Sequence, residues 1–199
     1  MNKNITTRIL PCVQVSNIRA TNLNENLTFK NAANGDNLFV LNGTEISKWK
    51  NLIFLTPSLN IIVPPNAQIN FDVSDKCDTP YFIHNHYKGL ICSPKNPGFS
   101  AVMNEISIKT YYSSAAKFTV KKVHGVDALN LNGNGYRQQM NNGSVITQNG
   151  TDFHIFYASS NAQIDEFLIE YEINSGITFK CIRFIFFWII LVCAFGFYC

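Results

Sequence analysis

Alternation of apolar and polar residues, the pattern typical of β-strands, is the main regularity of this chain. In the second half it occurs at 105–110, 117–120, 128–133, 152–158 and 166–173. In the last of these segments the aromatic and aliphatic residues share one face, and Glu170 and Glu172 take the other. Asn-Gly pairs between the segments are turn signals. No segment before residue 177 keeps a helical period, so we predict an all-β fold with short strands at β-sandwich spacing.

An internal repeat organises these strands into two copies. Both copies show a strand, a loop with an aspartate, a second strand ending in glycine, a polar loop and an alternating final strand. The matching segments are 27–43 with 118–133, and 69–87 with 153–173. The repeat predicts two tandem β-sandwich units, one over residues 1–88 and one over 89–173. The second unit begins within KGLICSPKNPGF, where a short strand runs into a turn fixed by two prolines.

The C-terminal segment 184–199, FIFFWIILVCAFGFYC, is apolar on all sides and carries no charge. It is slightly shorter than the roughly 20 residues that cross a bilayer as a helix. Before it stand three small residues, beginning with Asn174 and Ser175, and a short spacer. Small residues, a spacer and an apolar tail are the parts of a GPI-attachment signal. Residues 174–199 are therefore predicted to be such a signal, attached at Asn174 or Ser175, or an uncleaved membrane anchor.

Charge and motifs exclude several classes of function. The formal net charge is +3, spread over isolated lysines and arginines, so no footprint for nucleic acid is present. The sequence has no glycine-rich phosphate loop, no G-x-S-x-G and no H-E-x-x-H motif, and we therefore predict that the protein is not an enzyme. Residues 1–20 lack an apolar stretch of signal-peptide length. Either the chain is tail-anchored and faces the cytosol, or its recorded N-terminus is incomplete.

Cysteines and glycosylation motifs bear on the compartment. Cys12, Cys77 and Cys92 precede the tail region, and Cys77 and Cys92 enclose a short loop that a disulfide can close in an oxidising compartment. Cys12 then lacks a partner, as expected if that partner lay upstream. The alternative is three unrelated free thiols. Asn-x-Ser/Thr triplets, the acceptors of N-glycosylation in secreted proteins, occur at Asn4, Asn26, Asn42, Asn142 and Asn149.

The order of these features resembles the CUB domain, an extracellular β-sandwich module of the jelly-roll kind. GLICSPKNPGF is similar to the opening strand and turn of that family, and DNLFVLNG and DALNLNG are similar to its Asp-x-Leu-x-Val-x-x-Gly strand. INFDVSD and DEFLIEY resemble its last two strands, and CVQV resembles its second strand. The resemblance implies that the first copy lacks its N-terminal part. It also implies that Cys92 is left to pair with Cys77, because Asn104 stands near the position equivalent to Cys12.

Two candidate metal sites follow. Some CUB domains bind calcium through a glutamate and two aspartates, oxygen ligands that a hard cation needs. Asp36 and Asp75 match the two aspartates of the first copy, but no glutamate precedes Asp36, so a calcium site would be incomplete. Separately, His84 and His86 point to the same side of a strand at a spacing that suits zinc, although the repeat aligns them with outward-facing glutamates.

We therefore predict a non-enzymatic binding or adhesion module, displayed at the cell surface on a membrane anchor. It would recognise a protein or a carbohydrate through the loops of its sandwiches, and no cofactor is implied apart from the calcium. One alternative is a redox or hydrolytic metalloenzyme on the same sandwich, with His84 and His86 as ligands. Another is a tail-anchored tether that faces the cytosol.

Overall fold

The computed structural model describes residues 10–21, 25–76 and 86–175, and about two-thirds of these residues are in strands. The elements are β1 (Val13–Thr21), β2 (Asn26–Asn31), β3 (Asn37–Asn42), the 3-10 helix η1 (Gly43–Lys48), β4 (Trp49–Phe54), β5 (Leu59–Ile62), β6 (Gln68–Ser74), β7 (His86–Ser93), β8 (Val102–His124), β9 (Ala128–Gly133), β10 (Tyr136–Gln139), β11 (Val145–Ser159) and β12 (Glu166–Ser175). The predicted all-β class is confirmed. No helix within these ranges is long and apolar enough to span a membrane.

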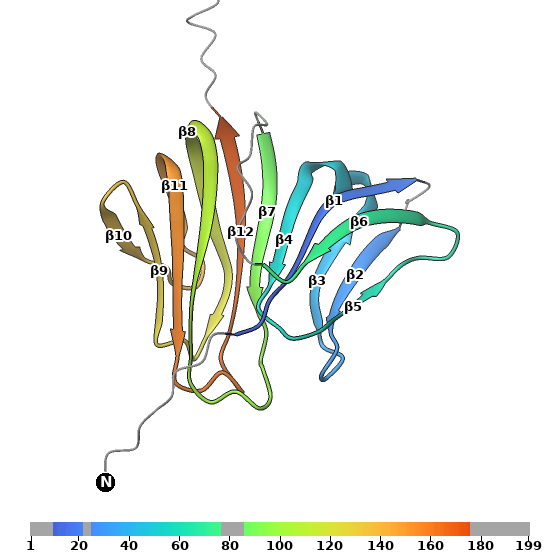
Figure 1. Ribbon diagram of the computed structural model, residues 1–199, viewed down its shortest axis with the longest axis horizontal. Coiled ribbons are helices and arrows are strands. Elements are labelled where there is room, and N and C mark those ends of the chain that lie inside the picture. The colour runs from blue at the N-terminus through green and yellow to red at the C-terminus, as the bar shows by residue number, and fades with distance from the viewer. Residues whose placement is uncertain (1–9, 22–24, 77–85, 176–199) are drawn as a thin grey trace, which may run out of the picture.

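Nine of the strands form one continuous sheet (Figure 1), in the order β10-β9-β11-β8-β12-β7-β4-β1-β6. Neighbouring strands are antiparallel except for β4 and β7, which run parallel. The long strands β8 and β11 pair along almost their whole lengths as a two-stranded ribbon. Their register shifts between Gly150 and Asp152, where the ribbon folds over. The sheet therefore makes two layers: β10, β9 and one half of the ribbon form the first, and the other half continues through β12 and β7 in the second.

The fold of the ribbon, called the bend below, consists of residues 111–113 of β8. The hydroxyl groups of Thr110 and Ser114 each donate a hydrogen bond of 2.8 Å to the carbonyl oxygen of Tyr112. Thr110 and Ser114 are buried, whereas residues 111–113 are exposed. The segments 105–110 and 117–120, predicted as two strands, are thus one strand. Side-chain hydroxyl groups hold the backbone at the turn, so no loop separates the two halves.

A hydrophobic core fills the space between the two layers. Inward residues of β9, β11 and the first half of β8 meet inward residues of β12, β7, β4 and the second half of β8. Aromatic pairs connect strands that are not neighbours in the sheet: the ring centroids of Tyr157 and Phe167 are 4.8 Å apart. The predicted alternation of β12 is confirmed, since Phe167, Ile169, Tyr171 and Ile173 are buried in this core.

A second core lies on the other side of β4 and β7. There the small sheet β3-β2-β5 packs against β1, β4 and β7. Phe29 of β2 stacks on Phe54 of β4, with ring centroids 5.3 Å apart. Figure 1 shows these shorter strands on the right of the molecule, beside β1 and β6.

The central strands β4 and β7 contribute to both cores. In β4, Ile53 enters the first core and Leu52 and Phe54 enter the second; in β7, Ile91 and Leu90 divide in the same way. This burial on two faces explains the continuous apolar runs of these strands. The boundary predicted between residues 88 and 89 is corrected: it falls inside β7, which pairs with β4 on one side and with β12 on the other.

Candidate functional site

The candidate site is the solvent side of the first layer. Along β8 and β11 every second residue is buried in the core, so the residues between them point outward. The pairing of the four strands places these outward residues in rows across the sheet. One row is Arg137, Asn132, His154 and Ser107, and the next is Gln139, Asn130, Phe156 and Glu105. Together with Met103, Lys109 and Asp152, these residues are called the outer face below.

His154 is the centre of a polar network on the outer face. Its Nδ1 lies 2.9 Å from Oε1 of Glu105 on β8, and its Nε2 lies 3.2 Å from Oδ2 of Asp152 on its own strand. The hydroxyl of Ser107 donates to Oδ1 of Asp152 at 3.2 Å. His154 is about one-third exposed, with a side-chain relative accessibility of 36%. The network therefore fixes the orientation of an imidazole and two carboxylates that solutes can reach.

An aromatic ring and two amides lie beside this network. The guanidinium of Arg137 lies over the ring of Phe156, 6.0 Å from its centroid. Asn130 is buried by its neighbours, and Asn132 is half-buried. The Oδ1 atom of Asn132 is buried without a hydrogen-bond partner among the described residues. An unpaired buried acceptor is costly, and a small rotation of the half-buried Asn132 side chain would let a ligand on the outer face satisfy it.

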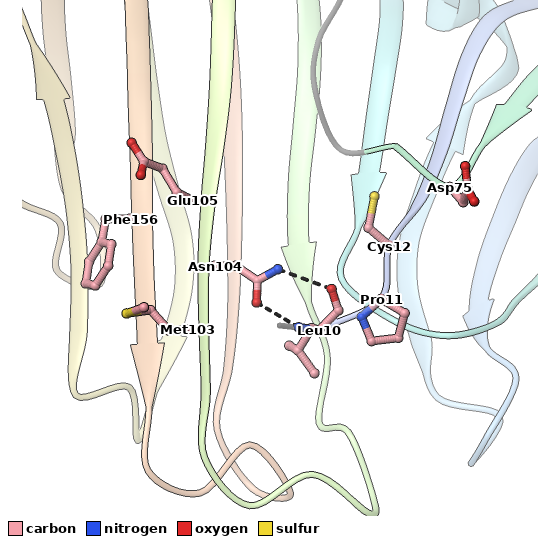
Figure 2. Close-up of a pocket in the computed structure, with 8 residues that line it drawn as sticks. All are labelled: Leu10, Pro11, Cys12, Asp75, Met103, Asn104, Glu105 and Phe156. Carbon is pink, nitrogen blue, oxygen red and sulfur yellow. Dashed lines mark hydrogen bonds between the residues drawn. The ribbon is translucent and has the colours of Figure 1, made fainter. Parts of the chain in front are cut away.

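Two hollows lie at the margins of the outer face. The larger, about 610 Å³, lies between the first half of β8 and the segment that precedes β1 (Figure 2). The side-chain amide of Asn104 holds this segment, accepting from the backbone nitrogen of Leu10 at 3.0 Å and donating to the Leu10 carbonyl at 3.2 Å. The smaller hollow, about 510 Å³, is at the β9–β10 turn. Its lining is Gly133, Asn134, Tyr136, Arg137, Gln138, Gln148 and Asn149.

The network on the outer face does not have the geometry of a hydrolytic triad. A serine nucleophile needs its hydroxyl on a histidine nitrogen, whereas Ser107 donates to Asp152 and both nitrogens of His154 meet carboxylates. Among the described residues, no group of three or more His, Cys, Asp or Glu side chains is placed to hold a metal ion. What the outer face offers is a fixed set of donors and acceptors beside an aromatic ring.

The predicted bridge between Cys77 and Cys92 is corrected. Cys92 is a free thiol, and it lies in the second core on β7. Burial raises the pKa of this thiol to about 12, so it stays protonated at neutral pH. Cys12, which was predicted to lack a partner within the chain, is disulfide-bonded. Cys77 lies outside the described residues.

The two predicted calcium ligands contact no common group among the described residues. Asp36 is exposed in the β2–β3 turn, where its Oδ2 accepts from the side chain of Asn34 at 2.8 Å. Asp75 follows β6 and lines the larger hollow, on its far side in Figure 2. Calcium binding stays a prediction. Of the two candidate zinc ligands, His86 is exposed on β7 with its Nδ1 at Oδ1 of Asn174, and His84 lies outside the described residues.

The glycosylation and anchor residues are placed as follows. The side chains of Asn26, Asn42, Asn142 and Asn149 are all exposed. The Oδ1 atom of Asn42 also caps η1 by accepting from the backbone nitrogen of Thr44 at 3.0 Å. Asn174 and Ser175 are the last residues of β12 and still pair with β8. Attachment of a lipid anchor at either residue would therefore require the end of this strand to open.

Sequence reasoning missed the outer face. It considered His84 and His86 because they stand two residues apart in the chain, whereas His154, Glu105 and Ser107 meet only through strand pairing. Alternation alone places 103, 105, 107 and 109 on one face of a strand, and 152, 154 and 156 on one face of another. The register that brings the two sets together depends on the bend, which leaves no recognised signal in the sequence.

Comparisons with known proteins assign no family. No family model matches the chain, and no curated protein matches it. Among solved structures, the chain is similar to the conserved protein of unknown function PA5104 from Pseudomonas aeruginosa PAO1. The identity is 10%, the match covers 82% of this chain and 71% of the other, and the TM-score is 0.29. A likeness of this size carries no argument about fold or function, and the CUB resemblance stays a prediction.

Proposed function

We propose that this protein is a non-enzymatic carbohydrate-binding module, displayed at the cell surface, and that it binds through the outer face. The observation that carries the proposal is the row Arg137, Asn132, His154 and Ser107, which crosses four strands with Phe156 beside it. This differs from recognition through sandwich loops, because the ligand contacts come from paired strands. The CUB-like resemblance belongs to the same proposal, since that family consists of extracellular modules.

The chemistry of the outer face suits the hydroxyl groups of a sugar. Guanidinium and amide groups are planar and present two hydrogen-bonding positions side by side, and carboxylates accept through two oxygens. Neighbouring sugar hydroxyls offer a matching pair of donors and acceptors. The ring of Phe156 gives an apolar surface on which the C–H face of a sugar can pack. Because the polar network already orients His154, Glu105 and Asp152, binding would cost little ordering of side chains.

The charge of the outer face favours a neutral ligand. Counting histidine as neutral, its two carboxylates, Glu105 and Asp152, are matched by two cationic side chains, Lys109 and Arg137. A polyanion such as nucleic acid or a sulfated chain is recognised by clustered positive charge, which this face does not have. A neutral oligosaccharide is recognised by polar groups without a large net charge, as on this face.

Display at a membrane surface rests on the apolar segment 184–199, as a GPI-attachment signal or as a retained anchor. The exposure of Asn26, Asn42, Asn142 and Asn149 supports an extracellular location, because glycosylation requires accessible asparagines. The disulfide at Cys12 agrees with an oxidising compartment. An enzyme and a cytosolic tether remain the alternatives from other classes, and nothing in the geometry of the outer face favours either.

A glycan array tests the proposal. The full chain, purified in detergent, should bind a restricted set of neutral oligosaccharides, and binding should not follow the charge of the glycan. The variants Asn132→Ala and Arg137→Ala should lose these signals, whereas Lys121→Ala, on the far side of the second layer, should keep them. An array on which the wild-type protein binds no glycan, or only anionic ones, would contradict the proposal.

A further inference from the structure

The bend of β8 presents two tyrosines to solvent at one end of the molecule. Tyr111 and Tyr112 are each 57% exposed, so more than half of each aromatic side chain meets solvent. Their backbone is fixed, since Thr110 and Ser114 both donate to the carbonyl oxygen of Tyr112. The tyrosines are therefore held outward by a built turn and are not the tip of a loose loop.

The bend is at the end of the sheet from which the chain continues to its apolar segment. Ser175, the last residue of β12, pairs with Ser114, the residue that follows the bend. Figure 1 shows the end of β12 beside the fold of the ribbon. Only eight residues, 176–183, separate Ser175 from the apolar segment that begins at Phe184. Fully extended, they span about 28 Å at most.

We infer that the bend faces the lipid bilayer and that Tyr111 and Tyr112 contact the headgroup region. The inference rests on the membrane anchoring that belongs to the proposed function. If the apolar segment enters lipid, the end of β12 lies within about 28 Å of the bilayer. The start of β12, nine residues away, lies about 30 Å farther along the strand. A GPI anchor at Asn174 or Ser175 also ties this end of β12 to the bilayer, so both modes of anchoring give the same orientation.

The side chains at the bend have the chemistry of a membrane interface. Tyrosine is enriched at the boundary between headgroups and acyl chains, because its ring is apolar and its hydroxyl group is polar. Two adjacent tyrosines on a fixed turn would enter this boundary without ordering a loop. In this orientation the strands run away from the bilayer. The outer face, on the solvent side of the first layer, is then open to a ligand.

Photo-crosslinking to lipid headgroups tests the orientation. The full chain is reconstituted into phosphatidylcholine vesicles that contain phosphatidylethanolamine with a benzophenone on its headgroup. After illumination, crosslinked peptides are mapped by mass spectrometry. We expect crosslinks on the peptide that contains Tyr111 and Tyr112, and several-fold fewer on the peptide that contains Ile164. Ile164 is the matched control, because it is 51% exposed and precedes the start of β12 at the opposite end of the sheet.

Variants separate the inference from the anchoring on which it rests. Tyr111→Ser with Tyr112→Ser should reduce crosslinking at the bend several-fold, whereas Ile164→Ser should leave it unchanged. Crosslinks on residues 176–199 without crosslinks at the bend would overturn the orientation and leave the anchoring intact. No crosslinks on either would overturn both, and crosslinks at Ile164 equal to those at the bend would show that the domain has no fixed orientation.

Discussion

Gly89 shows how a single residue is fixed by packing between two strands. It lies in β7 directly opposite Tyr171 of β12. A Cβ atom at this position would lie 2.0 Å from Cζ of Tyr171, far inside van der Waals contact. The glycine that marks the CUB-like opening in the sequence therefore has a physical cause in this structure: a buried tyrosine ring lies across the strand at that point.

We expect Gly89→Ala to lower the free energy of unfolding by about 1–3 kcal/mol, because the tyrosine ring must move within a packed core. Chemical denaturation measures the loss. Ala115→Ser in β8, a small change at a half-buried strand position, is the control. If Gly89→Ala matched the wild-type stability, the close contact with Tyr171 would be wrong.

Buried acids give the protein a specific response to alkaline pH. Burial raises the pKa of Cys92 to about 12, and it also raises the pKa values of Tyr87, Tyr157 and Tyr171. In the unfolded chain these groups release protons near their ordinary values of 9.0 and 10.0. Above pH 9 the unfolded state therefore binds fewer protons than the folded state, and the stability contributed by these groups is lost as pH rises.

The free energy of unfolding should thus fall steadily between pH 8 and about pH 11. Urea titrations at several pH values measure it. Tyr171→Phe should flatten this fall, since it removes one of the buried acids. Constant stability across this range would mean that the three tyrosines are accessible to water.

At the scale of elements, the sequence was informative about strands but not about their connection. Alternation located β9 at 128–133 and β12 from residue 166, because one face of each strand packs in the core and the other faces solvent. It did not recognise that β4 and β7 are central, since strands buried on both faces lose their alternation. It also divided β8, because the run Tyr111 to Ala116 has no alternation although the pairing with β11 continues on both sides of the bend.

The hydroxyl groups at the bend can be tested directly. Replacing Thr110 with valine and Ser114 with alanine removes both donors to the carbonyl of Tyr112, and we expect a loss of about 1–3 kcal/mol. Ser113→Ala is the matched control, since the Ser113 side chain is exposed. Equal stability of the double variant and the control would show that water satisfies this carbonyl, and the bend would then not be fixed by its side chains.

At the scale of the whole molecule, the two cores share β4 and β7. β7 pairs with β4 on one side and with β12, from the second half of the chain, on the other. Removing either half of the chain would leave one side of β7 unpaired. We therefore expect one cooperative unfolding transition, in contrast to the two that independent tandem units would give. Calorimetry tests this through the agreement of the calorimetric and van't Hoff enthalpies. Two resolved transitions, or a folded fragment 89–173, would restore the division predicted from the repeat.

The outer face is the central claim about function, and calorimetric titration of a glycan selected on the array tests it most directly. We predict that Asn132→Ala and Arg137→Ala each weaken binding about tenfold or more, since a lost hydrogen bond to a charged or buried partner costs about 1.5–3 kcal/mol. Lys121→Ala and Glu170→Ala break an ion pair on the other layer and should leave the dissociation constant unchanged. Unchanged binding by the outer-face variants, with a loss in Lys121→Ala or Glu170→Ala, would contradict the claim.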